Sequence, residues 1–424
     1  MYPYYLTFFI SILFCAMGER EFRKRRWVSY PSIFLAVLGP VILAGARDFS
    51  IGLDISAYGN YVFETAYKYK SLAGFMRTHR NIESLYKVMA FAVSRFTDNP
   101  HWFYFLTALI ICGCTMGGLF YYYLRGWCPL TPAWACFLFI LYGDTLNIMR
   151  QSIAVAIAFA AFPLFLEKKY LLYMAMQAAA ILFHVTSIFT LCLPLIYLFM
   201  KVFHVKWIYI VVFFCGFAAI QLYSPLLTYL IRIHVLPAKF SRYLGTGVAF
   251  ALNPTILRLP FLIPILYFFE RFCSFEISDH VLRPITKLRL IRNYSVKEAL
   301  TTRFNWGLKW RGVGGDGSRN SYSVDPVLGI FVVFLLLLEI CTVQLRSVLP
   351  ALYRISYYFC YYRFIAYSRL TKILRRDNTV MVLLALFAYL CVLWYYQNVI
   401  QGNNCIYPYI YAKDWYERII HFSG

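Results

Sequence analysis

The sequence predicts an all-α, polytopic integral membrane protein. Hydrophobic residues make up 61% of the 424 residues and charged residues only 14%, whereas soluble domains carry about 25% charged residues. The mean hydropathy is +0.61, and the aromatic content of 20% suits a chain that crosses the headgroup region many times. The net charge of +22 is concentrated in short segments between apolar runs. This pattern is typical of cytoplasmic membrane loops and argues against nucleic acid as a partner.

Apolar runs of about 20 residues predict the spanning helices, because a helix satisfies its own backbone polar groups inside the bilayer. Two further apolar segments, 84–97 and 236–252, are short or broken and could span, re-enter or lie in the interface. One of these two is expected not to cross, so we expect about 12 crossings in all. No internal repeat is visible, so residues 1–424 are expected to form one polytopic membrane domain. The predicted spans are 2–17, 28–46, 101–124, 131–146, 148–166, 171–200, 207–231, 254–272, 324–343, 350–368 and 378–399.

Basic residues predict the orientation, because Lys and Arg mark the cytoplasmic side. The first span has no basic segment before it and no small-residue cleavage site after it, so we expect it to stay in the protein. A basic cluster at 20–26 follows this span, which places the amino terminus outside and 47–83 in an outer loop. The segment 273–323 carries nine basic and four acidic residues and is expected to be a cytoplasmic loop. Arg354 and the tail 403–424 then fall on the outer side.

Polar groups directly after the second span form the first candidate cluster. Arg47 could bind a phosphate with both arms of its guanidinium. Asp48 or Asp54 could take a proton from a sugar hydroxyl or orient Arg47, and Tyr58 lies four residues beyond Asp54. The alternative is an ordinary interfacial Arg–Asp pair at a helix end.

The second cluster is Asn147, Arg150 and Gln151, with Ala154 one turn further on. In a helix these positions share one face, which could bind an anion while packing closely against a neighbour. The alternative is an interfacial Arg at the start of a helix.

Two more clusters follow. His184 and Ser187 lie within the apolar run 171–200, and an intramembrane His is a candidate for proton transfer; the alternative is a neutral His that bonds a neighbouring helix. Arg354, Tyr357 and Tyr358 could place a guanidinium and two phenols at the outer surface, or could belong to an aromatic belt with a snorkelling Arg. No cluster has metal-ligand spacing and no nucleotide-binding loop is present, so we expect no metal and no cofactor.

The order of these motifs resembles the EpsG family of Wzy-like bacterial polysaccharide polymerases, which serve O-antigen, capsule or exopolysaccharide synthesis. The 273–323 loop is longer than we expect of that family. The residues that carry the resemblance are Arg47, Asp48, Gly52, Asp54 and Tyr58, then Asn147, Arg150, Gln151 and Ala154, then His184 and Ser187, then Arg354, Tyr357 and Tyr358.

The resemblance implies a GT-C-like architecture and a glycosyltransferase of the bacterial cytoplasmic membrane whose active site faces outward. Such an enzyme moves glycan from undecaprenyl pyrophosphate to another lipid-linked repeat unit, without a metal. Arg150 and Arg354 would then bind the pyrophosphate with help from Arg47, and Asp48, Asp54 or His184 would be the base. Whether a chain-length regulator protein binds stays open.

Two other functions remain open from the sequence. A flippase for lipid-linked oligosaccharide would use a similar cationic site, but single repeat units would not accumulate on the outer face of a deletion strain. A glycosyltransferase that uses a polyprenyl-phosphate sugar could hold a divalent ion at Asp48 and Asp54, and a chelator would abolish its activity.

Overall fold

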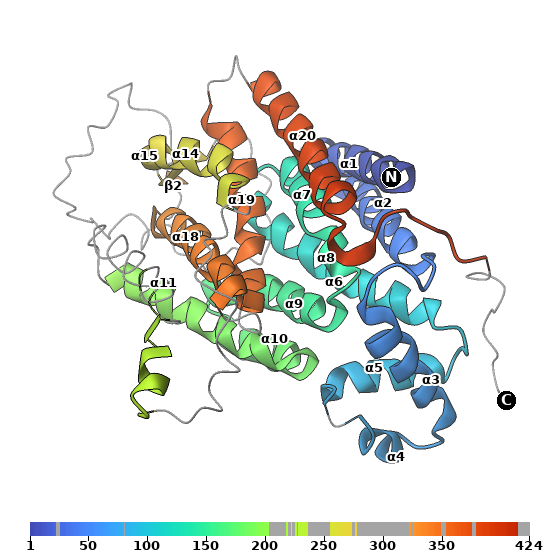
Figure 1. Cartoon of the computed structure of the whole chain (residues 1–424). Coiled ribbons are helices and arrows are strands. Elements are labelled where there is room, and N and C mark those ends of the chain that lie inside the picture. Colours follow the sequence, from blue (N-terminus) through green and yellow to red (C-terminus); the bar gives the residue numbers. More distant parts are fainter. Residues whose placement is uncertain are drawn as a thin grey trace, which may run out of the picture.

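The computed structural model is a bundle of helices (Figure 1). The predicted segment 236–252 lies outside the described residues, as do 23–25, most of the span 207–231 and most of the loop 273–323. The structure describes residues 1–22, 26–79, 81–202, 218, 222, 225–226, 228–235, 255–273, 276–277, 322–323, 326–348, 353–374 and 379–413.

The amino-terminal half begins with an antiparallel helix pair, α1 and α2, against which α6 and α7 pack. Between α2 and α6 the chain leaves this bundle and forms a group of short helices (Figure 1). The elements of this half are α1 (Tyr2–Phe22), α2 (Arg26–Gly45), the π-helix η1 (Ile55–Asn60), α3 (Tyr61–Lys68), α4 (Leu72–Met76), α5 (Ser84–Ser94), α6 (His101–Leu124), α7 (Leu130–Ile140), α8 (Tyr142–Thr145) and α9 (Met149–Leu166).

The carboxyl-terminal half packs against α9 chiefly through α10, and against α7 through α19 and α20. Its only described strands are a two-residue antiparallel pair, in which Glu276 lies opposite Ser323. The elements are α10 (Tyr170–Phe183), the 3₁₀ helix η2 (Val185–Leu191), α11 (Cys192–Val202), α14 (Leu259–Tyr267), α15 (Phe269–Cys273), β1 (Glu276–Ile277), β2 (Tyr322–Ser323), α18 (Pro326–Val348), η5 (Tyr353–Ser356), α19 (Tyr357–Ile373), α20 (Thr379–Tyr395), η7 (Tyr396–Ile400) and η8 (Asn403–Cys405).

The predicted class, a polytopic helical membrane protein, is confirmed. Within the described residues, six helical segments are long and apolar enough to cross a bilayer. Three shorter apolar helices accompany them: α5, α7 and α10. The six segments are Trp27–Gly45, His101–Leu124, Met149–Leu166, Val185–Val202, Val327–Gln344 and Val380–Ile400.

The predicted single span 171–200 is wrong, because the chain reverses direction at His184. The backbone of His184 is extended, with φ −160° and ψ 118°. The η2 helix then folds back along α10, and Thr190 Oγ1 donates to Gln177 Oε1 at 2.8 Å. Hydropathy cannot reveal this reversal because both arms are apolar. His184 therefore lies at the tip of a helical hairpin and not in the middle of a spanning helix.

Other boundaries also differ from the prediction. The expected span 131–146 ends as α7 at Ile140, and the α9 helix begins only at Met149, so Asn147 precedes that helix. The expected span 254–272 is divided into α14 and α15. The expected span 350–368 begins as the short η5 helix and continues in α19.

The helices have two distinguishable ends. At one, which we call the Arg47 end, Tyr4 Oη donates to the Ile406 carbonyl at 3.0 Å, and Arg47 pairs with Tyr411. At the other, which we call the Arg369 end, Arg369 Nη1 donates to the Trp127 carbonyl at 3.2 Å. The loop after α2 and the start of the tail, both predicted to lie outside, thus share the Arg47 end.

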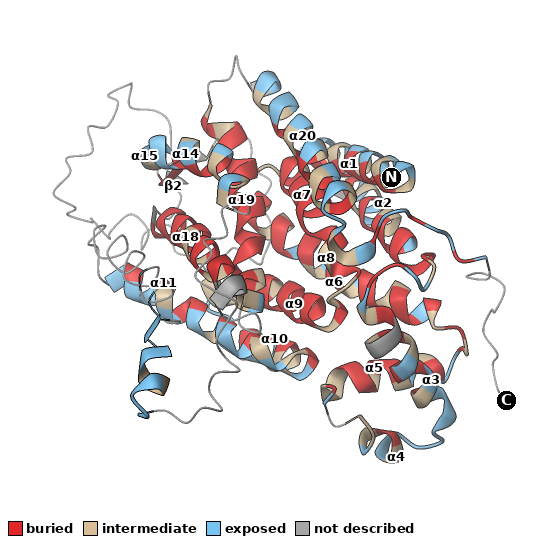
Figure 2. Ribbon diagram, in the orientation of Figure 1, coloured by how far each residue is buried: buried red, intermediate tan, exposed pale blue. Residues whose placement is uncertain are grey.

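The core is aromatic and lies between α7, α9, α18 and α19 (Figure 2). Phe162 stacks on Phe331 with ring centroids 5.0 Å apart, and Tyr362 meets Phe331 edge-on. In contrast, α10, α11 and α20 carry exposed apolar side chains such as Leu171, Leu195 and Val392. These faces would contact the lipid bilayer.

Candidate functional site

One carboxylate joins two of the predicted clusters. Glu83 directly precedes α5, and its Oε1 lies 2.6 Å from His184 Nδ1. Its Oε2 accepts from Arg150 Nη1 at 2.5 Å. Burial opposes the charged form of Glu83, but the hydrogen bond from His184 and the charge of Arg150 hold its pKa below its ordinary value. An anionic Glu83 therefore fixes the orientation of the His184 ring and of the Arg150 guanidinium.

Arg150 lies at the start of α9 and is also held by an aromatic ring. Its guanidinium carbon lies 4.1 Å from the centre of the Tyr58 ring, a cation–π geometry. Tyr58 comes from the π-helix η1, so the loop after α2 meets α9 here. The predicted residues Tyr58, Arg150 and His184 are thus brought together through Glu83.

Asp54 belongs to the same cluster. Its backbone N–H donates to Asn147 Oδ1 at 3.0 Å. Burial raises the pKa of Asp54, and the nearby charges of Arg354, Arg150 and His184 only partly offset that effect. A half-buried carboxylate with a raised pKa beside cationic groups is typical of functional sites.

Asp48 lies apart from this cluster. It forms a local turn in which Oδ1 accepts from the Ser50 backbone N–H at 2.9 Å. The Ser50 hydroxyl and N–H lower the pKa of Asp48. Asp48 and Asp54 therefore have different partners and different electrostatic surroundings. Among the described residues, no group of three potential metal ligands occurs.

Arg354 reaches the cluster from the other half of the chain. Gln151, which is 2% exposed, donates from Nε2 to the Arg354 carbonyl at 2.7 Å. The Arg354 side chain itself is exposed, and the structure gives its guanidinium no hydrogen bond within the described residues. Arg354 lies in η5, and Tyr357 and Tyr358 begin the α19 helix that follows η5 directly.

The two tyrosines after Arg354 have different neighbours. The Tyr358 hydroxyl lies 2.8 Å from Thr186 Oγ1, which ties α19 to η2. Tyr357 is partly buried and packs beside Tyr353. Ser187 is fully buried on η2, and its hydroxyl has no hydrogen-bond partner among the described residues. The Nε2 atom of His184 is likewise enclosed and unpartnered within the described part of the chain.

Arg47 does not join the cationic cluster. Only 1% of Arg47 is exposed, its Nη2 contacts Met149 Sδ at 3.4 Å, and its guanidinium carbon lies 5.2 Å from the centre of the Tyr104 ring. Its backbone pairs with that of Tyr411. Its Nε and Nη1 atoms are buried and have no hydrogen-bond partner among the described residues.

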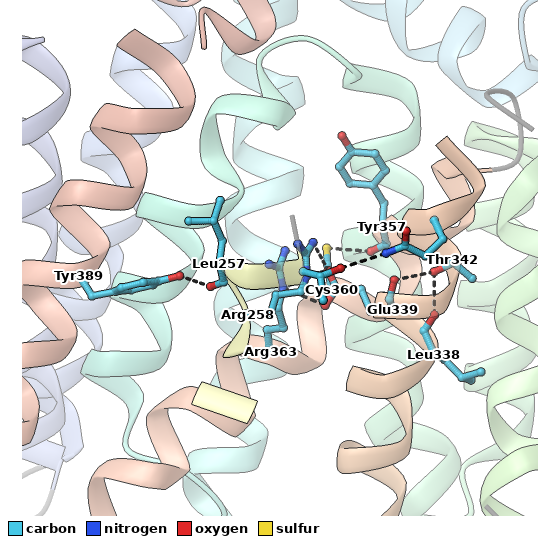
Figure 3. Close-up of polar contacts among 11 residues, drawn as sticks. Leu257, Arg258, Leu338, Glu339, Thr342, Tyr357, Cys360, Arg363 and Tyr389 are labelled. Atoms are coloured by element: carbon cyan, nitrogen blue, oxygen red, sulfur yellow. Dashed lines mark hydrogen bonds and ion pairs between the residues drawn. The ribbon is translucent and has the colours of Figure 1, made fainter. Parts of the chain in front are cut away.

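A second ionic cluster lies within the bundle (Figure 3). Glu339 of α18, which is 1% exposed, accepts from Arg258 Nη2 at 2.8 Å, and its Oε2 lies 3.1 Å from Arg363 Nε of α19. Nearby, Tyr389 of α20 donates to the Leu257 carbonyl. This cluster joins α18, α19, α20 and the segment before α14.

The sequence reasoning missed Glu83, Glu339 and Asn404. Glu339 carries a recognisable signal, because a carboxylate inside an apolar run is a functional candidate by default. Glu83 precedes a short apolar segment and gives no such signal. Asn404 lies in the polar tail, far from every motif, and only the three-dimensional structure shows its contacts.

Comparison with known proteins gives one match. The model of the EpsG family matches residues 30–296, which is more than half of the chain. This range contains Arg47, Asp54, Arg150 and His184 but not Arg354. No curated protein and no solved structure matches the chain.

Proposed function

We propose, from the premise that this chain belongs to the EpsG family of polysaccharide polymerase-like membrane proteins, that it is a repeat-unit polymerase. It transfers glycan from undecaprenyl pyrophosphate to the terminal sugar of another lipid-linked repeat unit. The bond between the anomeric carbon and the pyrophosphate breaks, and polyprenyl pyrophosphate leaves. The proposed location is the outer face of the cytoplasmic membrane.

The convergence of Asp54, Arg150, His184 and Arg354 at one end of the bundle supports this proposal. These residues come from four separate segments of the chain, and Glu83, Asn147 and Gln151 hold three of those segments in place. Two guanidinium groups with a carboxylate and an imidazole meet the needs of glycosyl transfer, which are charge stabilisation on the leaving group and removal of one proton.

Arg354 is the proposed primary ligand of the pyrophosphate. Its guanidinium is exposed, and no described residue accepts a hydrogen bond from it. Arg150 is held by Glu83 and Tyr58, so it offers a second, fixed positive charge at the same place. Guanidinium groups suit this role because their paired donors match phosphate oxygens.

His184 is the proposed base. Glu83 holds its Nδ1 and so favours the tautomer in which Nε2 carries the free lone pair. As the acceptor hydroxyl attacks the anomeric carbon, its proton passes to Nε2. Attack opposite the leaving group inverts the anomeric configuration. Asp54, with its raised pKa, would bind sugar hydroxyls or orient the guanidinium groups of Arg150 and Arg354.

The remaining predicted residues have supporting roles in this proposal. Asn147 holds the backbone of Asp54, Gln151 holds that of Arg354, and Tyr358 ties α19 to the His184 hairpin. Tyr357 and Ser187 lie next to these contacts. The low pKa and local turn of Asp48 make it a poorer proton acceptor than Asp54.

Glycan chain length tests the proposal. A deletion strain is complemented with wild type, Arg354→Ala, Arg354→Lys or His184→Gln, and the polymer is separated on a gel. We expect loss of about 10²-fold or more of long polymer in each variant, with single repeat units accumulating on the outer face. The matched control is Arg77→Lys, an exposed Arg next to α4.

The same experiment can overturn the proposal. Normal long polymer from Arg354→Ala would remove the pyrophosphate site. Absence of single repeat units from the outer face of the deletion strain would instead favour a flippase.

A further inference from the structure

The segment after α20 runs back along the loop that carries Asp54. The Asp48 N–H donates to the Ile410 carbonyl at 2.9 Å, and the Ala412 N–H donates to the Ala46 carbonyl at 3.0 Å. The Gly52 N–H donates to the Cys405 carbonyl at 3.3 Å. Figure 1 shows this red segment passing beside the end of α2. We call residues 402–412 the tail strap.

Asn404 of the tail strap reaches the second motif. It has a left-handed backbone conformation, with φ 65°. Its Nδ2 donates to Asp144 Oδ1 at 2.5 Å, and its Oδ1 accepts from Asn147 Nδ2 at 3.2 Å. Asn147 Oδ1 in turn accepts from the Asp54 N–H at 3.0 Å. Asp144, Asn404, Asn147 and Asp54 thus form one continuous chain of hydrogen bonds.

The direction of this chain is set at Asp144. A carboxylate can only accept hydrogen bonds, so Asn404 must turn its NH₂ group toward Asp144 and its oxygen toward Asn147. Asn147 must then present its own NH₂ group to Asn404, which leaves its oxygen for the Asp54 N–H. Without Asn404, the Asn147 amide could rotate and place its NH₂ group against that N–H.

We propose that Asn404 is a positioning residue for Asp54, acting through Asn147 with its orientation set by Asp144. This proposal rests on the proposed polymerase function. It makes the tail strap part of the site, although the strap lies outside the matched range 30–296. In this proposal the strap acts by holding the backbone of the loop that carries Asp54.

Exchanging the hydrogen-bond donor and acceptor between positions 404 and 144 tests this chain of hydrogen bonds. Asn404→Asp places two carboxylates against each other, and we expect the turnover number to fall by at least about tenfold through their repulsion. In Asp144→Asn the new amide can accept from Asn404 or donate to it, so the direction of the chain is no longer fixed, and we expect a smaller loss of activity than in Asn404→Asp. In the double variant, the amide at position 144 donates to the carboxylate at position 404, which still accepts from Asn147. We expect its activity to return to that of Asp144→Asn.

A pH profile separates positioning from general stability. Acidification should partly restore Asn404→Asp, because protonation of one of the two carboxylates restores a donor between them. Wild type and the double variant should show no such gain. Thermal unfolding in detergent is measured for all four proteins, and the double variant shows whether a carboxylate at position 404 is compatible with folding.

The outcomes are distinct. The positioning role fails if the double variant is as weak as Asn404→Asp, or if Asn404→Asp is fully active. Either result leaves the proposed function in place as long as Arg354→Ala is inactive. If Arg354→Ala is fully active in the same assay, the proposed function fails. The assay measures polyprenyl pyrophosphate released from a lipid-linked repeat unit by the full-length protein in nanodiscs.

Discussion

Gln151 donates a hydrogen bond to the backbone carbonyl of Arg354 at 2.7 Å, although the two residues lie 203 positions apart in the chain. This bond joins the start of α9 to η5, and it fixes the backbone from which the exposed guanidinium extends. Because Gln151 is buried, water cannot readily replace it.

Gln151→Leu should displace Arg354. The change leaves the partly buried Arg354 carbonyl without its donor, which costs about 0.5–1.5 kcal/mol in the free energy of unfolding. We expect the variant to make shorter polymer than its loss of folding stability alone would explain. The matched control is Gln344→Leu, another buried Gln, whose Nε2 donates to Thr255 Oγ1 and not to Arg354. Equal losses of polymer in the two variants would contradict a specific role for Gln151.

Gly52→Ala should disturb the loop that carries Asp54. Gly52 has φ +98°, and a Cβ atom there would lie 2.8 Å from the Leu146 carbonyl oxygen. Left-handed strain alone costs about 1–2 kcal/mol, and the contact with backbone adds to it. Gly402→Ala is the control, since it has φ +63° but open space around its Cβ position. The unfolding temperature should fall further in Gly52→Ala than in Gly402→Ala. Equal falls would show that the contact with the Leu146 carbonyl oxygen adds no cost.

The pH dependence of stability should reflect Glu83. The pKa of Glu83 in the folded protein lies below its ordinary value of 4.5. Its stabilisation is therefore complete above that value and is lost as the pH falls through the lower folded pKa. Glu83→Gln should flatten the acid-side fall of the unfolding temperature, whereas the exposed control Glu64→Gln should retain it.

Asp54 should have the opposite effect from Glu83 on the pH dependence of folding stability. Its folded pKa is raised, so the folded state takes up a proton more readily than the unfolded chain and gains relative stability on acidification. Asp54→Asn removes this gain. Its unfolding temperature should therefore fall more steeply with acidification than that of wild type, and an unchanged slope would contradict the raised pKa.

Replacing Glu339 should destabilise the protein more than replacing Arg258, one of its two partners (Figure 3). Glu339 is the shared partner of Arg258 and Arg363, so Glu339→Gln leaves one buried cation and one partly buried cation without their carboxylate. We expect a loss of about 3–5 kcal/mol. Arg258→Gln leaves the Glu339–Arg363 pair intact and should cost less. Expression level and thermal unfolding in detergent measure both, and a more severe loss from Arg258→Gln would contradict this account.

Much of the arrangement could be predicted from the sequence. Apolar run length predicted the membrane class, and the basic residues predicted that the Arg47 loop and the tail share one end. The motifs also indicated residues that the structure brings together, namely Asp54, Tyr58, Arg150, His184 and Arg354. Their roles in catalysis stay proposals.

The rest depends on contacts between distant segments. The reversal at His184 follows from one extended residue between two equally apolar arms, which no hydropathy average can detect. The burial of Arg47 against Tyr104 cannot be predicted from the sequence either, and its predicted role as a phosphate ligand stays a prediction. Glu83 became important only when the fold placed it between Arg150 and His184.

The residues on either side of the long basic segment meet at one point of the bundle. A Cβ atom on Gly329, near the start of α18, would lie 2.9 Å from Cys273 Cα at the end of α15. Because the chain leaves and rejoins the helices at neighbouring positions, insertions or deletions between them can be accommodated without moving any helix. Relatives could therefore differ widely in this segment and still share the same membrane scaffold.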